Sequence, residues 1–208
     1  MARKKTAAKK SARKVRDPGE AIIDTALAIA AESGWGAVTM AAVAEHTNLA
    51  LGDVLLFAPT RAHLLVKFLD RLDAANLAGL TGSGDGSARD RLFDVVMRRF
   101  DLLNQKRDAV RAVIAGVPRD PSSAALLACR AGRSAAALLG AAGISAEGLM
   151  GFARVQGLKA VMAATLRAWM TDDSADMAKT MAALDKALAR AERFASFKGW
   201  RRPADAAL

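Results

Sequence analysis

The side chains that could catalyse a reaction or bind a metal are few and far apart in this sequence. The two histidines, His46 and His63, have no Cys, Asp or Glu partner at the spacing of a metal site. The single cysteine, Cys129, lies among Ala, Leu and Arg, which is typical of a small buried hydrophobe. The glycines of segment 81–87 follow no predicted strand and no lysine follows them in register, so they do not match a phosphate-binding loop. We therefore predict no catalytic residues, no metal and no cofactor, and a protein that is not an enzyme.

Positive charge suited to phosphate groups is concentrated at the N-terminus. Residues 1–16 carry eight Lys and Arg side chains and no acid, within a chain of net charge +10. Such a tail can bind nucleic acid, because each neutralised phosphate releases a counterion; a solubilising tail without a specific partner is the equally open alternative. Residues 17–60 carry six acids and no Lys or Arg, so any nonspecific attraction to DNA must come mostly from the tail.

Length and composition predict a folded protein rather than a disordered or membrane-spanning one. The 208 residues are 52% hydrophobic and 25% charged, enough for a sizeable core. The chain contains no apolar run of the roughly 18 to 20 residues that span a bilayer. The basic start also lacks the apolar stretch of a secretory signal. We expect no membrane insertion and a cytoplasmic location.

The elements that must position any functional residue are all predicted to be helices. Ala, Leu, Met, Arg and Lys dominate, Tyr is absent, and no stretch alternates as a strand does. Apolar periodicity and capping residues predict nine helices, at about 20–33, 39–46, 50–57, 60–79, 88–106, 108–117, 122–141, 145–171 and 174–197. The predicted domains are a disordered basic tail (1–18), a head (19–60), a larger helical body (61–198) and a flexible C-terminus (199–208).

Two short helices in the head are predicted to meet at a tight corner. Thr39 is a suitable N-cap for the first, and Asn48 tolerates the positive φ that the corner needs. Together with the preceding helix, these elements are typical of a helix-turn-helix that places its second helix in the major groove of DNA.

Residues 20–70 of the chain resemble the TetR family of transcriptional regulators. The resemblance lies in Glu32-Ser33-Gly34 at the end of the first helix, Thr39, Val43-Ala44, Gly52 and Pro59-Thr60-Arg61. It implies an all-α TetR-like fold and a homodimer whose two heads read successive major grooves of double-stranded DNA. It also implies a helical body that binds a small ligand and shifts the spacing of the heads. The family's usual phosphate-binding tyrosine aligns with Leu55, and its small hydroxyl residue aligns with Ala50.

Three groups of site residues follow from the sequence and the resemblance. The expected DNA-binding residues are Arg13, Lys14, Arg16, Thr39, Asn48, Ala50, Leu51, Asp53, Leu55, Arg61 and Lys67. The expected lining of a pocket for a small apolar ligand or lipid is Met97, Phe100, Val155, Leu158, Met162, Leu166 and Trp169, although such a stripe is more often filled core. The expected dimer contacts on the last helix are Met177, Met181, Leu184 and Leu188, with packing inside one subunit as the open alternative.

The function expected from these features is that of a ligand-responsive DNA-binding regulator, most simply a repressor. One alternative is a lipid-binding accessory protein, because the chain is also similar to the TetR-fold proteins of ubiquinone biosynthesis around Leu56-Phe57-Ala58-Pro59 and Leu166–Ser174. A basic-tailed helical scaffold with neither activity is the third possibility.

Overall fold

The computed structural model describes residues 17–79 and 86–197, and only the backbone of 194–197. Within these ranges the chain folds into nine α-helices and two short 3-10 helices, with no strand, as the sequence predicts. The predicted tail residues Arg13, Lys14 and Arg16, and the predicted C-terminus from 199 onward, lie outside the described residues. None of the helices in the described part of the chain is long and apolar enough to cross a lipid bilayer.

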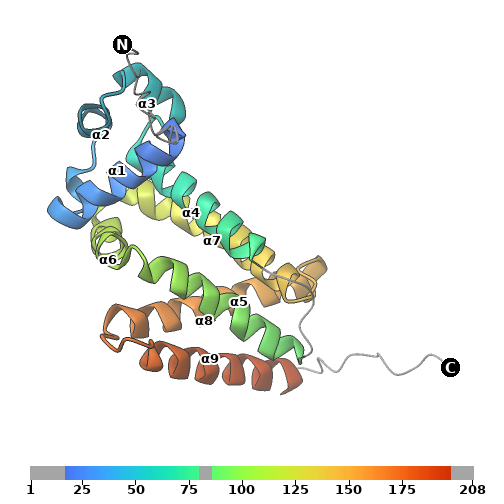
Figure 1. The fold of residues 1–208 in the computed structure, drawn as a ribbon. Helices are drawn as coiled ribbons and strands as arrows, with labels where there is room; N and C mark the ends of the chain where they lie inside the picture. The colour runs from blue at the N-terminus through green and yellow to red at the C-terminus, as the bar shows by residue number, and fades with distance from the viewer. Residues whose placement is uncertain (1–16, 80–85, 198–208) are drawn as a thin grey trace, which may run out of the picture.

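The first three α-helices form one end of the molecule (Figure 1). Asp17 caps the first helix by accepting a hydrogen bond from the Gly19 amide at 3.0 Å, and Pro18 occupies its first turn, where a missing N–H costs nothing. Gly34 ends this helix at φ 83°, a conformation that favours glycine. The elements of this end are α1 (Pro18–Ser33), η1 (Trp35–Ala37), α2 (Met40–Thr47) and α3 (Leu51–Phe57).

The remaining helices form the larger part of the structure. In Figure 1, α4 leads away from the first three helices and lies beside α7, while α8 and α9 lie at the opposite end of the molecule from α3. The elements are α4 (Arg61–Ala78), α5 (Ala88–Asn104), α6 (Arg107–Gly116), η2 (Val117–Arg119), α7 (Pro121–Ala141), α8 (Gly148–Met170) and α9 (Ala178–Phe197). Each predicted helix is present within a few residues of its expected bounds.

The turn between α8 and α9 differs from the prediction that the last helix begins near residue 174. Oδ2 of Asp172 accepts hydrogen bonds from the amide of Thr180 at 2.8 Å and from its hydroxyl at 2.7 Å. Ser174 also donates its hydroxyl to Asp172. Because the buried carboxylate reaches eight residues along the chain, the intervening residues form a turn and α9 begins at Ala178.

The predicted dimer stripe on the last helix packs inside its own chain. Met177 and Leu188 are each 5% exposed and Leu184 is fully buried, while Met181 is partly buried. Met177, Leu184 and Leu188 therefore leave no surface for a second copy, and their assignment as dimer contacts is wrong. The apolar stripe exists because α9 packs along α8 and against α5.

A charge cluster, buried except for Asp70, joins α4, α5 and α7. Asp73 pairs with Arg99 and accepts hydrogen bonds from Arg130 at 2.6 Å and Ser134 at 2.7 Å. Arg130 also pairs with Asp70, at 2.7 Å. Two acids face two arginines, so the formal charges cancel and each guanidinium has an acceptor, which is the condition for burying charge.

Candidate nucleic-acid interface

The predicted helix-turn-helix is present, and local chemistry explains its shape. Oγ1 of Thr39 accepts a hydrogen bond from the Ala42 amide at 3.1 Å and so caps α2, which leaves its hydroxyl proton free to donate. Asn48 adopts φ 55°, and the chain reverses between α2 and α3 as predicted. Val43 and Val54 are fully buried and fix the two helices against the rest of the core.

The third helix presents an apolar surface to solvent. Leu51, Leu55 and Leu56 are 45%, 41% and 87% exposed, and Asp53 beside them is also exposed. Ala50 occupies the N-cap position but has no side chain to cap the helix. Exposed leucines can contact the methyl group of thymine but donate no hydrogen bonds to base edges. The exposed face of α3 therefore offers apolar side chains and one carboxylate, and no side-chain hydrogen-bond donor.

Two basic residues near this surface have different environments. Lys67 is exposed, and its ammonium lies 5.3 Å from the centre of the Phe57 ring at the end of α3, so it remains available to a phosphate. Nε of Arg61, by contrast, donates to Oδ2 of Asp120 at 2.7 Å, and Nη1 donates to the carbonyl of Gly36 at 3.2 Å. Arg61 therefore joins the head to the body, and the structure does not place it as a free phosphate ligand.

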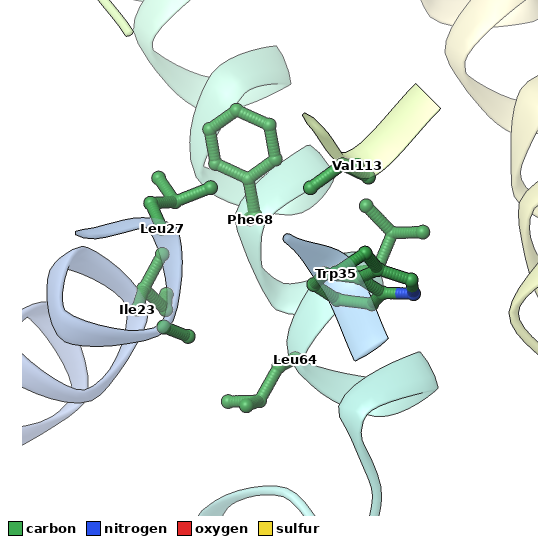
Figure 2. Close-up of a pocket in the computed structure, with 8 residues that line it drawn as sticks. Ile23, Leu27, Trp35, Leu64, Phe68 and Val113 are labelled. Atoms are coloured by element: carbon green, nitrogen blue, oxygen red, sulfur yellow. The ribbon is translucent and has the colours of Figure 1, made fainter. Parts of the chain in front are cut away.

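Trp35 is a structural residue of this region that the sequence analysis did not assign. It is 3% exposed, and Figure 2 shows it between Ile23 and Leu27 of α1, Leu64 of α4 and Val113 of α6. A large apolar side chain directly after a helix-ending glycine was the available signal, because such a residue is well placed to close the helix against its neighbours. Trp35 thus forms one of the contacts through which the head meets the body.

The residues predicted to line a ligand pocket form a packed layer instead. Phe100, Leu158 and Trp169 are at most 3% exposed, and the rings of Phe100 and Trp169 lie 6.4 Å apart in a tilted pair. The other four predicted residues are partly buried against the same core: Met97, Val155, Met162 and Leu166. This is the filled-core arrangement that was the alternative to a pocket, and a ligand role for these residues stays a prediction.

Cys129 is exposed on α7, contrary to the expectation of a buried thiol. Its side of the helix, which it shares with exposed Arg133, faces solvent rather than α4.

Comparison with known proteins places sequence similarity in one group of repressors. A segment of 74 residues is 42% identical to the HTH-type transcriptional repressor KstR of Mycolicibacterium smegmatis, covering 32% of this chain and 36% of that protein. KstR of Rhodococcus jostii is 44% identical over 50 residues, 24% of each chain, and KstR of Mycobacterium tuberculosis is 39% identical over 56 residues, 27% of this chain and 26% of that protein. The matched segments thus span about a third or less of these repressors, and no family model matches the chain.

Solved structures match nearly the whole fold. A TetR transcriptional regulator from Nitrosomonas europaea superposes with a TM-score of 0.67 at 24% identity, over 85% of this chain and 99% of that one. A TetR regulator from Rhodococcus sp. RHA1 gives 0.56 at 20% identity, over 81% and 94% of the two chains. One from Pseudomonas syringae gives 0.51 at 20% identity, over 89% and 97%. The chain has the fold of the TetR transcriptional regulators, and part of its sequence is similar to that of the KstR repressors.

Proposed function

We propose that this chain is a TetR-type transcriptional repressor that binds double-stranded DNA as a homodimer. The observation that carries the proposal is the helix-turn-helix, in which Thr39 caps α2, Asn48 makes the corner and α3 projects its leucines into solvent. The similarity to KstR repressors supports the same function and favours it over a lipid-binding accessory protein.

DNA contact in this proposal divides between positioning and reading. The Thr39 hydroxyl and the amides at the start of α2 donate to a phosphate, where the helix dipole also favours negative charge. Lys67 adds a positive charge at the end of α3. Leu51 and Leu55 contact thymine methyl groups, which favours A·T pairs at the centre of each half-site. The basic residues Arg13, Lys14 and Arg16 supply long-range, salt-dependent attraction.

The surface that joins two copies in this proposal is on α8 rather than on the buried stripe of α9. Leu149, Met150 and Phe152 are 90%, 48% and 63% exposed in its first turns. Further along α8 the exposed residues include small side chains: Ala153, Ala160, Ala163 and Ala164. Large apolar side chains followed by alanines let a second helix approach closely along the length of α8, which suits a four-helix bundle with the partner's α8 and α9.

The experiment that tests the function is selection of binding sites from a random duplex pool, followed by gel-shift titration of the enriched sequence. We expect a palindromic operator with half-sites about one helical turn apart. Leu55→Glu should weaken operator binding at least about tenfold, because it replaces a contact with a thymine methyl group by a carboxylate that the negative potential of the DNA repels. Leu77→Glu makes the same change at a 38% exposed leucine of α4 and should leave binding unchanged. A pool that yields no enriched sequence, or a Leu55→Glu variant that binds as the parent does, would reject the proposal.

A further inference from the structure

A cleft of about 360 Å³ separates the head from the body at one side of the molecule. Its head side includes Trp35 and Gly36 of η1, and Arg61, the first residue of α4, lies where the head meets the body. Its body side includes Ala112 of α6, Arg119 of η2 and Asp120, the cap of α7. The volume is in the range of pockets that hold small molecules, roughly 300 to 1,000 Å³. We call this space the junction cleft.

The charge of the junction cleft favours an anion. Asp120 is already satisfied: it accepts hydrogen bonds from Arg61, from the Ser122 hydroxyl at 2.7 Å, and from both the amide and the hydroxyl of Ser123. Arg119, by contrast, hydrogen-bonds within the described residues only to the carbonyl of Ala115, and no carboxylate there lies within 4.0 Å of it. With Arg61 and Arg119 against Asp120, the lining carries a formal charge of +1, and the uncompensated charge is that of Arg119.

A second, independent feature is a buried donor that lacks an acceptor. Nε1 of Trp35 is buried and has no hydrogen-bond partner among the residues that the structure describes, although most buried polar groups in proteins have one. Figure 2 shows this nitrogen on the edge of the indole turned away from Ile23 and Leu27. The same tryptophan lines the junction cleft, and Cδ1, the ring atom bonded to this nitrogen, would lie 3.2 Å from a Cβ added at Gly116, another residue of the cleft. This edge of the indole is therefore the one at which a ligand in the cleft could supply the acceptor.

We propose that the junction cleft binds a small organic carboxylate. Arg119 pairs with the carboxylate, for which the planar guanidinium is suited because it can donate two parallel hydrogen bonds. Trp35 Nε1–H donates to the same ligand. The apolar part of the ligand lies against the small side chains of Ala112 and Ala115.

Such a ligand would contact η1 in the head and both α6 and η2 in the body. A molecule that touches both parts stabilises the orientation in which it binds, and so shifts the population of head positions. This regulatory consequence rests on the proposed function, whereas the binding itself does not.

Binding is tested by NMR on the full chain labelled with ¹⁵N, with benzoate as the probe at constant ionic strength. The indole N–H signal of Trp35 is assigned by its loss in Trp35→Phe and is then followed through the titration. We expect a saturable shift with benzoate and none with the neutral analogue benzamide. Arg119→Gln should weaken binding at least about tenfold, while Arg133→Gln, at an exposed arginine of α7 outside the cleft, should not change it.

Three results would overturn the proposal: a Trp35 signal that benzoate does not move, an equal response in Arg119→Gln, or saturation by inorganic phosphate in a chain that ignores benzoate. The operator selection described above is independent of this titration. A chain that selects an operator but binds no benzoate would therefore overturn the carboxylate site alone. Saturable benzoate binding in a chain that selects no operator would support the site and reject its role in regulation.

Discussion

Nε of Arg61 lies 2.7 Å from Oδ2 of Asp120, which joins the first residue of α4 to the N-cap of α7. The Arg61 side chain is a third exposed, whereas the Asp120 side chain is 7% exposed. Because Arg61 also donates to the carbonyl of Gly36, this side chain links η1, α4 and α7. The Arg61 side chain, through its bonds to both Gly36 and Asp120, therefore couples the position of the head to the body.

We expect loss of the Asp120 cap to cost more stability than loss of its charge. Asp120→Ala removes the acceptor of the Ser123 amide and leaves Arg61 without its carboxylate, so unfolding free energy should fall by about 2 kcal/mol. Asp120→Asn keeps a capping oxygen and should cost less, on the order of 1 kcal/mol. Urea denaturation followed by circular dichroism measures both. Asp101→Ala, at an exposed position of α5, is the control that should remain within about 0.5 kcal/mol of the parent. Equal midpoints for Asp120→Ala and the parent would contradict the assigned role.

Stability should also fall in acid because of the turn before α9. Burial raises the pKa of Asp172, but hydrogen bonds from Ser174 and Thr180 outweigh burial and hold this pKa well below its ordinary value. A carboxyl whose pKa is lowered by folding stabilises the native state above its unfolded pKa, and that contribution is lost as the pH falls below about 4. Urea midpoints at neutral pH and at about pH 3 should therefore differ more for the parent than for Asp172→Asn. The same acid sensitivity in Asp172→Asn would show that other carboxyls account for it.

Glycine at position 116 should be necessary for the contact between α6 and η1. A Cβ added there would lie 2.5 Å from Cβ of Trp35, closer than carbon atoms approach without displacement. Gly116→Ala should therefore destabilise the fold by about 1 to 3 kcal/mol, because the clash is with the stem of a buried ring that has little freedom to move. Urea denaturation gives the change in free energy.

Gly132→Ala is the matched control, since Gly132 lies inside α7 with no atom within 4 Å of an added Cβ. Alanine there should stabilise the helix by up to about 1 kcal/mol. If both alanine variants were stabilised alike, the close packing of Trp35 on α6 would be disproved.

The fold was predictable because its signals are local. Helix periodicity, the Thr39 cap and the positive φ of Asn48 depend on residues only a few positions apart, and each is present in the structure. The start of α9 was missed because Asp172 bonds to Thr180 eight residues away, beyond any capping rule. Helix bounds could therefore be predicted where residues a few positions apart set them. They could not be predicted where a buried side chain bonds to a residue further along the chain.

The candidate site was less predictable because its partners are distant in sequence. Arg61 was expected on a phosphate, but its carboxylate partner is 59 residues away, and nothing local identifies it. The apolar stripe of α9 is compatible with packing inside one subunit and with packing between two subunits, since either arrangement would bury the same face of the helix. In the structure Leu184 is fully buried within its own chain, which decides between the two.

The exposed start of α8 should be required for dimer formation. Phe152 is 63% exposed and Leu149 is 90% exposed, so burying them against a second copy would contribute roughly 1.5 to 3 kcal/mol for each side chain, and a carboxylate there would be buried without a partner. Light scattering should give a dimer for the parent and a monomer for Phe152→Glu at micromolar concentration, with helix content unchanged. Leu77→Glu, on α4, should remain dimeric. Because a protomer that cannot pair reads only one half-site, Phe152→Glu should also lose most of its affinity for a palindromic operator while keeping its binding to random duplex. A parent that is already monomeric, or a Phe152→Glu variant that stays dimeric, would exclude this face as the contact between copies.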